Sequence, residues 1–309
     1  MKHYTVNTVC GLKNIDELGF TLMHEHIICV AALMLKTFPN FFDYHKLKRQ
    51  VIDKLREANE VYGVETLVDG TPFQLGRDVE LIQEISEQSG VNIIVSTGYY
   101  TPYEFGFNIV PIDIQAQYFA EECRNGIEKS SIRPAMLKSA SMKNDSDIAL
   151  QVMAETQKLT DLPLFLHSDS YCGNGIMQAE ILKKANCDMS KIIIGHVGDT
   201  MNFDYVEKIL QYGCFVSLDR IARASDAERK SSFYAEAAMR FGVEKLFFSH
   251  DCILYPIEKN SLQSGDPKEI GSLLSINKFL IPELRKRGFS DKELHQLFVE
   301  NPRKLWKKK

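Results

Sequence analysis

Four histidines and one aspartate stand at the ends of short apolar segments in this sequence of 309 residues. His24 and His26 close one segment, His167 and His196 close two others, and Asp251 closes the last. Neutral imidazoles and ionised carboxylates are good ligands for first-row divalent metals, and gathering them without a metal costs free energy. If the fold brings these segment ends together, their side chains predict a metal centre.

The remaining histidines are interpreted as structural, because a single histidine is more often hydrogen-bonded within a fold than bound to a metal. They lie in a terminus, in polar helical stretches or on the opposite face of a strand, and they are His3, His45, His295 and His250. Lys138 also ends an apolar segment. A free ammonium has no lone pair for a metal, so its residue type alone indicates a lysine that reaches the surface or pairs with Asp69.

The segments that carry these side chains recur along the chain with a steady spacing. Apolar runs typical of parallel strands covered on both faces span 21–27, 64–70, 92–98, 133–140, 162–168, 191–197, 214–219 and 245–251. Stretches with helical spacing separate them, at 44–62, 76–89, 112–128, 146–160, 174–186, 202–212 and 225–241. With a closing helix expected at roughly 271–288, the pattern makes eight strand–helix units, which close a barrel whose catalytic residues follow the carboxyl ends of the strands. The sequence therefore predicts an α/β fold, a (β/α)8 TIM barrel, with an open doubly wound sheet as the alternative.

The composition is that of an ordinary globular protein, with 44% hydrophobic and 25% charged residues and a net charge of −4. No linker or repeat divides the pattern, so residues 1–309 are expected to form a single domain. The sequence contains no long apolar run, no signal-like start and no basic stripe, so we expect a cytoplasmic protein with no membrane and no nucleic-acid partner. The odd number of cysteines, 7, without a CxxC motif favours thiols in a reducing compartment.

Motifs along the whole chain resemble those of the phosphotriesterase family, within the amidohydrolase superfamily. They are VNTVCGLKNIDELGFTLMHEH, VDGTPFQLGRD, STGYY, MLKSA, FLHSDS, IIIGHVGDT, SLDRIAR, FFSHD and ENPRKL. The resemblance implies a metal-dependent hydrolase barrel with two divalent ions, usually Zn²⁺, with Mn²⁺, Co²⁺ and Fe²⁺ as alternatives.

The resemblance also assigns the ligands. It implies that the buried ion is bound by His24, His26 and Asp251, and the more exposed ion by His167 and His196. Lys138 matches the bridging lysine of the family, which carbon dioxide converts to N6-carboxylysine, an anionic carbamate that contacts both metals. A water between two such metals has its pKa lowered toward ~7 and can attack as hydroxide. Asp251 is then the catalytic residue expected to accept the proton and pass it to the leaving group.

Three further residues bear on the substrate. Tyr100 matches a family position that lines the substrate pocket, and Arg220 and Arg223 follow the seventh predicted strand. Organophosphate-degrading relatives carry histidines in this segment, one of which relays protons to an aspartate that matches Asp199. An arginine cannot relay a proton because its pKa exceeds ~12, so this difference favours the lactonase branch of the family.

Arginine side chains at the barrel mouth suit an anionic small-molecule substrate, such as a phosphorylated or carboxylated sugar lactone. The alternative is that they pair with nearby acids such as Asp219 or Asp226. Three other functions remain open: a phosphotriester or phosphodiester hydrolase, an amide or amine hydrolase, and a metal-binding barrel without catalysis. The apolar stretch 29–42 could form a pocket wall or the interface of a homodimer.

Overall fold

Each of the eight apolar segments forms a strand of one parallel sheet in the computed structural model, which describes residues 4–41, 43–100, 109–140, 148–221, 224–254 and 273–307. The strands pair in chain order, and they are β3 (Phe20–Glu25), β4 (Val64–Asp69), β5 (Asn92–Gly98), β6 (Met136–Ala140), β7 (Leu164–His167), β8 (Ile192–Ile194), β9 (Phe215–Leu218) and β10 (Leu246–Phe248). Most are shorter than predicted, because the predicted segments include flanking residues, such as His196 and Asp251, that lie beyond the hydrogen-bonded ladder. The predicted barrel fold is confirmed.

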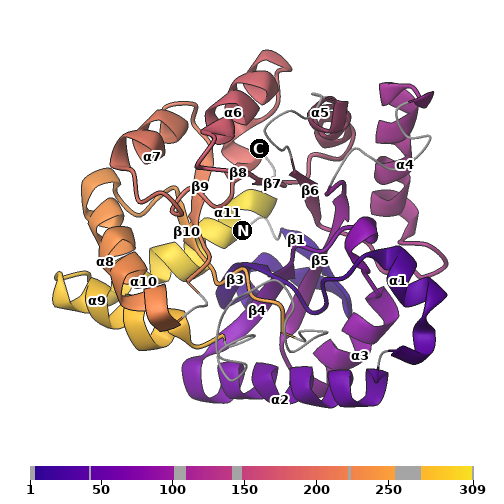
Figure 1. Ribbon diagram of the computed structural model, residues 1–309, viewed down its shortest axis with the longest axis horizontal. Helices are drawn as coiled ribbons and strands as arrows, with labels where there is room; N and C mark the ends of the chain where they lie inside the picture. The colour runs from indigo at the N-terminus through magenta and orange to yellow at the C-terminus, as the bar shows by residue number, and fades with distance from the viewer. Residues whose placement is uncertain are drawn as a thin grey trace.

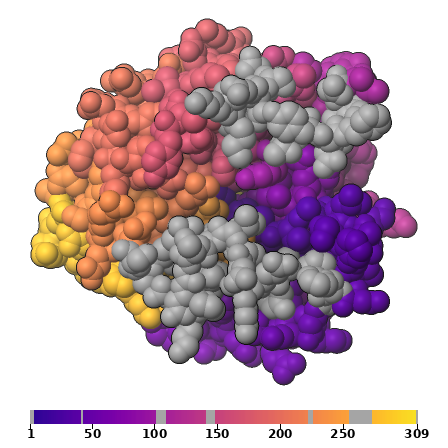
Figure 2. Space-filling view, in the orientation of Figure 1, coloured from indigo at the N-terminus to yellow at the C-terminus, as the bar shows by residue number. Residues whose placement is uncertain are grey.

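The sheet closes where β10 returns to β3. The amide of Asp251 donates to the carbonyl of His24 at 3.1 Å, and that of His26 donates to the carbonyl of Cys252 at 2.9 Å. The hydroxyl of Ser249 accepts from the amides of Met23 and His24 at 2.9 and 3.0 Å. Figure 2 shows the molecule from outside, where the colours run around it and the yellow of the last helices meets purple at the lower left. The seam therefore joins the two histidines of HEH to the segment that carries Asp251.

Helices form a ring around the strands (Figure 1). They are α2 (Tyr44–Tyr62), α3 (Val79–Ser89), α4 (Ile112–Asn125), α5 (Ile148–Thr160), α6 (Asn174–Lys184), α7 (Phe203–Leu210) and α8 (Ala224–Phe241). Side-chain caps fix several helix starts, since Asp43, Asp78 and Asn202 each accept from an amide of the first turn. After β10 the chain adds η6 (Ile276–Leu280), α9 (Ile281–Lys286), α10 (Asp291–His295), η7 (Gln296–Glu300) and α11 (Asn301–Trp306).

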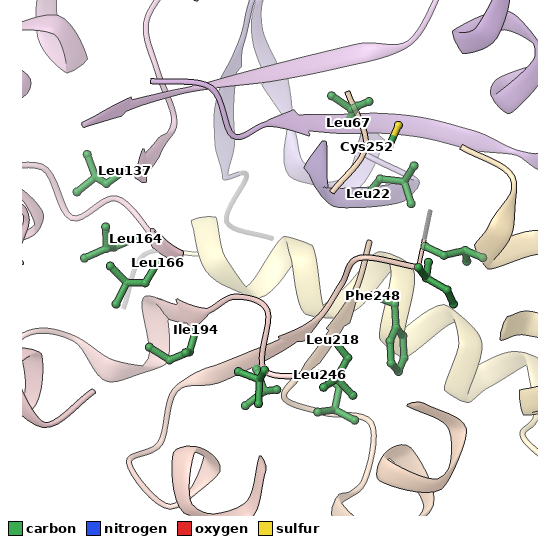
Figure 3. Close-up of a cluster of buried hydrophobic side chains, with 14 of the residues drawn as sticks. Leu22, Leu67, Leu137, Leu164, Leu166, Ile194, Leu218, Leu246, Phe248 and Cys252 are labelled. Carbon is green, nitrogen blue, oxygen red and sulfur yellow. The ribbon is translucent and has the colours of Figure 1, made fainter. Parts of the chain in front are cut away.

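Strand alternation divides the apolar residues into two cores. One residue of each strand joins an inner cluster inside the barrel: Met23, Val68, Ile94, Met136, Phe165, Ile193, Phe215 and Phe247. Their neighbours in the chain join the outer cluster between strands and helices, and Figure 3 shows Leu22, Leu67, Leu137, Leu164, Leu166, Ile194, Leu218, Leu246 and Phe248 among them. The same alternation brings Lys138 and His167 to the inner side, two residues after Met136 and Phe165.

Two parts of the fold were not predicted. An antiparallel hairpin, β1 (Thr5–Thr8) and β2 (Gly11–Asn14), precedes the barrel, and its neighbours Ile15 and Leu18 join Trp306 in the inner cluster. A short helix, α1 (Ala32–Thr37), with the η2 turn Pro39–Phe41, forms within the apolar stretch 29–42, for which no helix was predicted. No residue of α1 is buried, and Leu33 and Met34 are exposed. Among the described residues, no helix combines the length and apolarity that crossing a membrane requires.

Candidate metal centre

The predicted ligands of the deeper ion meet at the closing seam of the barrel. His24 lies in β3, while His26 and Asp251 lie just beyond the ends of β3 and β10. The Oδ1 atom of Asp251 is 3.5 Å from Nε2 of His24 and 3.3 Å from Nε2 of His26. Lys138 reaches the same place from β6, with Nζ 2.8 Å from Nε2 of His24.

The predicted ligands of the second ion lie beside this group. Nδ1 of His167, at the end of β7, is 2.8 Å from Nε2 of His196, which follows β8. One ligand atom each from His24, His196 and Asp251 falls within 4.8 Å of the others. The structure therefore brings all six predicted ligands to one end of the barrel.

A carboxylate predicted from the sequence only as an arginine partner, Asp219, contacts two of these histidines. Asp219 follows β9 and is fully buried. Its Oδ2 lies 3.0 Å from Nδ1 of His24, and its Oδ1 lies 2.8 Å from Nδ1 of His196. Burial opposes its ionisation, but the contacts with His196 and His24 hold the pKa of Asp219 well below its ordinary value. An ionised Asp219 accepts a hydrogen bond from each Nδ1, which leaves the Nε2 lone pairs of His24 and His196 facing the other predicted ligands.

The signal for Asp219 was present in the sequence. It lies two residues after Ser217 and four after Phe215, which points into the barrel, so it shares the inner face of its strand. Thr71, which was not predicted, has a similar role toward His26. Its hydroxyl lies 2.8 Å from Nδ1 of His26 and donates to the carbonyl of Ile28.

Glycine is required beside the histidines. A Cβ atom at Gly70 would lie 2.7 Å from Cδ2 and 3.1 Å from Nε2 of His24, and 3.4 Å from Cε1 of His26. The first distance is shorter than van der Waals contact allows, so a side chain here would displace a predicted ligand. Gly70 in the VDG motif thus keeps space for both imidazoles.

Lys138 is in an unusual environment for a lysine. It is buried, and its Nζ lies 4.4 Å above the ring of Phe165. Burial, opposed mainly by Asp251 and Asp219, lowers the pKa of Lys138 to about 8. Asp69, the alternative partner, instead accepts from the backbone amides of Thr71 and Ile27. A lysine with a lowered pKa has a neutral fraction that can react with carbon dioxide, since only the neutral amine is a nucleophile.

Three residues of the site, each two or three positions beyond the end of its strand, adopt left-handed backbone conformations. The φ angles are +59° at His196, +65° at Arg220 and +50° at Asp251. Residues other than glycine rarely occupy this region, and such strain persists only where surrounding contacts fix it. The chain therefore bends sharply at the ends of β8, β9 and β10 to present these side chains.

Arg220 connects Asp251, a predicted ligand, to a second carboxylate. Its Nε donates to Oδ2 of Asp251 at 2.9 Å, and its Nη1 donates to Oδ2 of Asp199 at 2.7 Å. Lys230, on α8, donates to the carbonyl of Arg220 at 2.7 Å and lies 3.4 Å from Asp199. Burial opposes the charge of Arg220, but Asp251 and Asp199 raise its pKa further above its usual range. The arginine is thus paired with acids, although not with Asp219 or Asp226.

The other two predicted substrate contacts differ in what the structure describes. Tyr100 is half-buried after β5, and its ring stands edge-on to that of His167 with 5.5 Å between the centroids. It therefore borders the more exposed pair of predicted ligands. Arg223 lies outside the described residues. Both substrate contacts, like that of Arg220, stay predictions.

Replacing Asp219 by Asn is expected to weaken divalent metal binding about 10–100-fold, the usual effect of losing a carboxylate that orients histidine ligands. An amide has one acceptor oxygen and cannot hold both imidazoles in the required tautomer. Ser217→Ala is the matched control, because it removes the hydroxyl 3.1 Å from Oδ2 of Asp219 and leaves both histidine contacts. Zn²⁺ titration of the two variants tests this, and equal affinities would contradict it.

The metal-free protein is expected to lose stability as the pH falls. Burial, followed by the charge of Lys138, lowers the pKa of His24 from 6.5 to about 3, so the folded state keeps this imidazole neutral. The unfolded chain binds the proton, and the free energy of unfolding therefore decreases from about pH 6.5 downward. Asp251 and Asp219, whose folded pKa values are lowered despite burial, add a loss of the same sign at more acidic pH. Urea titrations of chelator-treated protein at about pH 7.5, 6 and 5 should show falling midpoints, and a constant midpoint would refute the expectation.

Fold and site together define a TIM barrel with a candidate metal centre at the carboxyl ends of its strands. The chain belongs to the phosphotriesterase family, whose model matches residues 4–306. Members of this family are hydrolases that depend on two metal ions.

Relatives across the family have different activities in their names. The chain is 27% identical over 300 residues to the aryldialkylphosphatase of Saccharolobus solfataricus, covering 94% of this chain and 95% of that protein. The N-acetyltaurine hydrolase of Dictyostelium discoideum is 23% identical, with 97% of each chain covered. Among solved structures, the phosphotriesterase from Mycobacterium tuberculosis superposes with a TM-score of 0.88 at 27% identity and covers 98% of each chain.

The residues present fit a pair of divalent ions. Asp219 and Thr71 engage the Nδ1 atoms of three histidines, so that their Nε2 atoms are available as ligands. Nδ1 of His167 completes the set beside Nε2 of His196. Carboxylate and imidazole donors suit Zn²⁺ and other first-row ions.

Proposed function

We propose that this protein is a metal-dependent hydrolase that opens lactones, with an anionic sugar lactone as the preferred substrate. His24, His26 and Asp251 would hold one ion, His167 and His196 the other, and a carboxylated Lys138 would contact both. Two such ions would supply a Lewis acid for the scissile carbonyl and lower the pKa of a water toward neutrality. When that water attacks the carbonyl, Asp251 would accept its proton and return it to the leaving oxygen.

The observation that carries the proposal is the pairing of Arg220 with Asp251 at 2.9 Å. A guanidinium stays protonated, so it cannot carry a proton from Asp251 to Asp199. A lactone needs no such outlet, because its alkoxide leaving group is basic and stays tethered beside Asp251. An aryl phosphotriester releases a weakly basic aryloxide, which leaves the proton on Asp251 and requires a relay. The arginine therefore favours lactones over aryl phosphotriesters.

The preference for an anionic substrate rests on the N–H groups of Arg220 that do not contact Asp251 or Asp199. Arg220 uses Nε and Nη1 for its two carboxylates, and its side chain is 37% exposed. Its outer edge can still donate to a substrate carboxylate or phosphate, as guanidinium groups commonly do. Tyr100, edge-on to His167, would border the same substrate.

Amide hydrolysis is the second candidate. Relatives in the same family are named N-acetyltaurine hydrolase, and an amine leaving group can also take its proton directly from Asp251. Arg220 is thus compatible with amide cleavage as well as with lactone opening. It argues against only the aryl phosphotriesters that the name aryldialkylphosphatase indicates for another relative.

A substrate panel tests the proposal. Neutral, carboxylated and phosphorylated lactones, N-acyl amino sulfonates and an aryl phosphotriester would be assayed with the Zn²⁺-loaded protein, with and without chelator. We expect chelator-sensitive turnover with kcat/KM highest on an anionic lactone, and Arg220→Ala should lower it selectively there. Arg229→Ala is the matched control, because Arg229 is a largely exposed arginine of α8 paired with Asp226. Amides turned over faster than every lactone would support the second candidate, and equal losses on neutral and anionic lactones would overturn the anionic preference.

A further inference from the structure

The glutamate between the two histidines of the HEH motif has no part in the function proposed above. Glu25 is fully buried at the end of β3. Its Oε1 accepts from the backbone amide of His250 at 2.9 Å and lies 2.8 Å from Nδ1 of the same histidine. Its Oε2 accepts from the backbone amide of Cys252 at 3.0 Å. One buried carboxylate thus binds the chain on both sides of Asp251.

The segment it binds is strained at the residue that matters. Asp251 has a φ angle of +50°, a conformation that a residue with a side chain keeps only where its surroundings enforce it. The amide of Asp251 donates to the carbonyl of His24 at 3.1 Å, and the contacts of Glu25 fix the amides before and after it. This bend brings Oδ1 of Asp251 to 3.5 Å from Nε2 of His24.

The residue type suits the task. Three N–H groups converge on Glu25, and a carboxylate side chain can accept hydrogen bonds on both of its oxygens. An amide at this position would direct an NH₂ group at one of the donors and leave it unpaired in a buried site. His250 contributes to the arrangement, since its Nε2 accepts from the amide of Ile276 at 3.3 Å, which fixes Nδ1–H as the donor to Glu25.

We propose that Glu25 is a positioning residue, which holds Asp251 in its left-handed conformation so that its carboxylate is presented to the metal centre. Glu25 acts through the backbone of residues 250–252 and touches neither a metal nor a substrate. The proposal rests on the metal centre, not on the identity of the substrate, so a failure to find lactone turnover would leave it unaffected.

The test is a Co²⁺ titration of the metal-free full-length protein and its Glu25→Gln variant. We expect one of the two ions to bind about 10–100-fold more weakly in Glu25→Gln, because a ligand loses its support, while the ion at His167 and His196 binds as before. Saturating Co²⁺ should restore most of kcat on whichever substrate the protein turns over, since the ligand itself is still present.

Asn301→Ala is the matched control. Asn301 is fully buried, and its Nδ2 donates to the carbonyls of Val243 and Leu246 at 2.6 and 3.0 Å, so it fastens the opposite end of β10. It should lower Tm and leave Co²⁺ affinity unchanged. Equal loss of affinity in both variants would assign Glu25 a merely structural part and overturn the proposal, as would wild-type affinity in Glu25→Gln or a wild-type protein that binds no Co²⁺. If Glu25→Gln fails to fold, His250→Gln, which removes the Nδ1 donor, should weaken the same ion by a smaller factor, and unchanged binding would likewise overturn the proposal.

Discussion

Lys138→Met is expected to reduce kcat/KM by at least about 10³-fold, which corresponds to about 4 kcal/mol of transition-state stabilisation. The methionine keeps apolar volume above Phe165, where Nζ now lies 4.4 Å from the ring centroid, but removes the amine. Without a carbamate, the buried centre has only Asp251 and neutral imidazoles as predicted ligands for two cations. The missing anion should lower the metal content as well as the activity.

The amine also predicts a dependence on carbon dioxide. Burial lowers the pKa of Lys138 to about 8, so the neutral form is accessible near physiological pH. When Zn²⁺ is added back to the metal-free protein, activity should therefore return faster in the presence of bicarbonate. Protein prepared in ¹³C-bicarbonate should also show a carbamate signal that Lys138→Met lacks.

Lys191→Met is the control for removing a buried lysine. Lys191 is 3% exposed, and its Nζ lies 2.7 Å from Oδ1 of Asp161, remote from the predicted ligands. It should lower stability and keep two ions per chain. Full metal content and activity in Lys138→Met would reject the bridging role.

Asp251→Asn is expected to lower kcat by about 10³-fold, or about 4 kcal/mol. The change removes three functions at once: an anionic ligand near His24 and His26, the proton acceptor, and the partner of Arg220. The uncompensated Arg220 would add positive charge beside the metal centre. Rates measured with saturating Zn²⁺ separate the proton-transfer defect from the loss of metal.

Asp199→Asn distinguishes these functions. Asp199 is the other carboxylate bound to Arg220, at 2.7 Å, and is expected to take no part in proton transfer. Its replacement should change kcat by less than about tenfold. If both variants lost activity equally, the main task of Asp251 would be to pair with Arg220, and the proposed acid–base role would be wrong.

The barrel was predictable because its signal is local and repeated. Apolar strand segments and amphipathic helices recur at regular spacing, and the segment Asn92–Gly98 forms a strand with the predicted bounds. The hairpin of β1 and β2, Thr5–Asn14, was missed because its strands are short and half polar, and Val6 with the neighbouring Ile15 and Leu18 packs into the inner cluster of the barrel. Such packing is a tertiary contact that no short window of sequence contains.

For the candidate metal centre too, the sequence predicted the ligand residues but not the contacts between them. Residue type and strand-end position, with the family motifs, selected His24, His26, Lys138, His167, His196 and Asp251, since parallel strands bring their carboxyl ends to one face. Pairing between side chains could not be selected like this, because it depends on distances across the barrel. Asp219 lies between two histidines that precede it by 195 and 23 positions, and Arg220 pairs with Asp251 and Asp199 instead of the acids nearest in sequence.

The sequence by itself thus determined which residues could do the chemistry and on which fold. Only the tertiary structure decided which ring nitrogens of His24, His26 and His196 are left to bind a metal and which acids pair with Arg220. It also showed that Glu25 accepts hydrogen bonds from the backbone on both sides of Asp251. The physical reason is that ligand identity follows from residue type and strand periodicity, whereas tautomers and ion pairs follow from contacts between residues far apart in the chain.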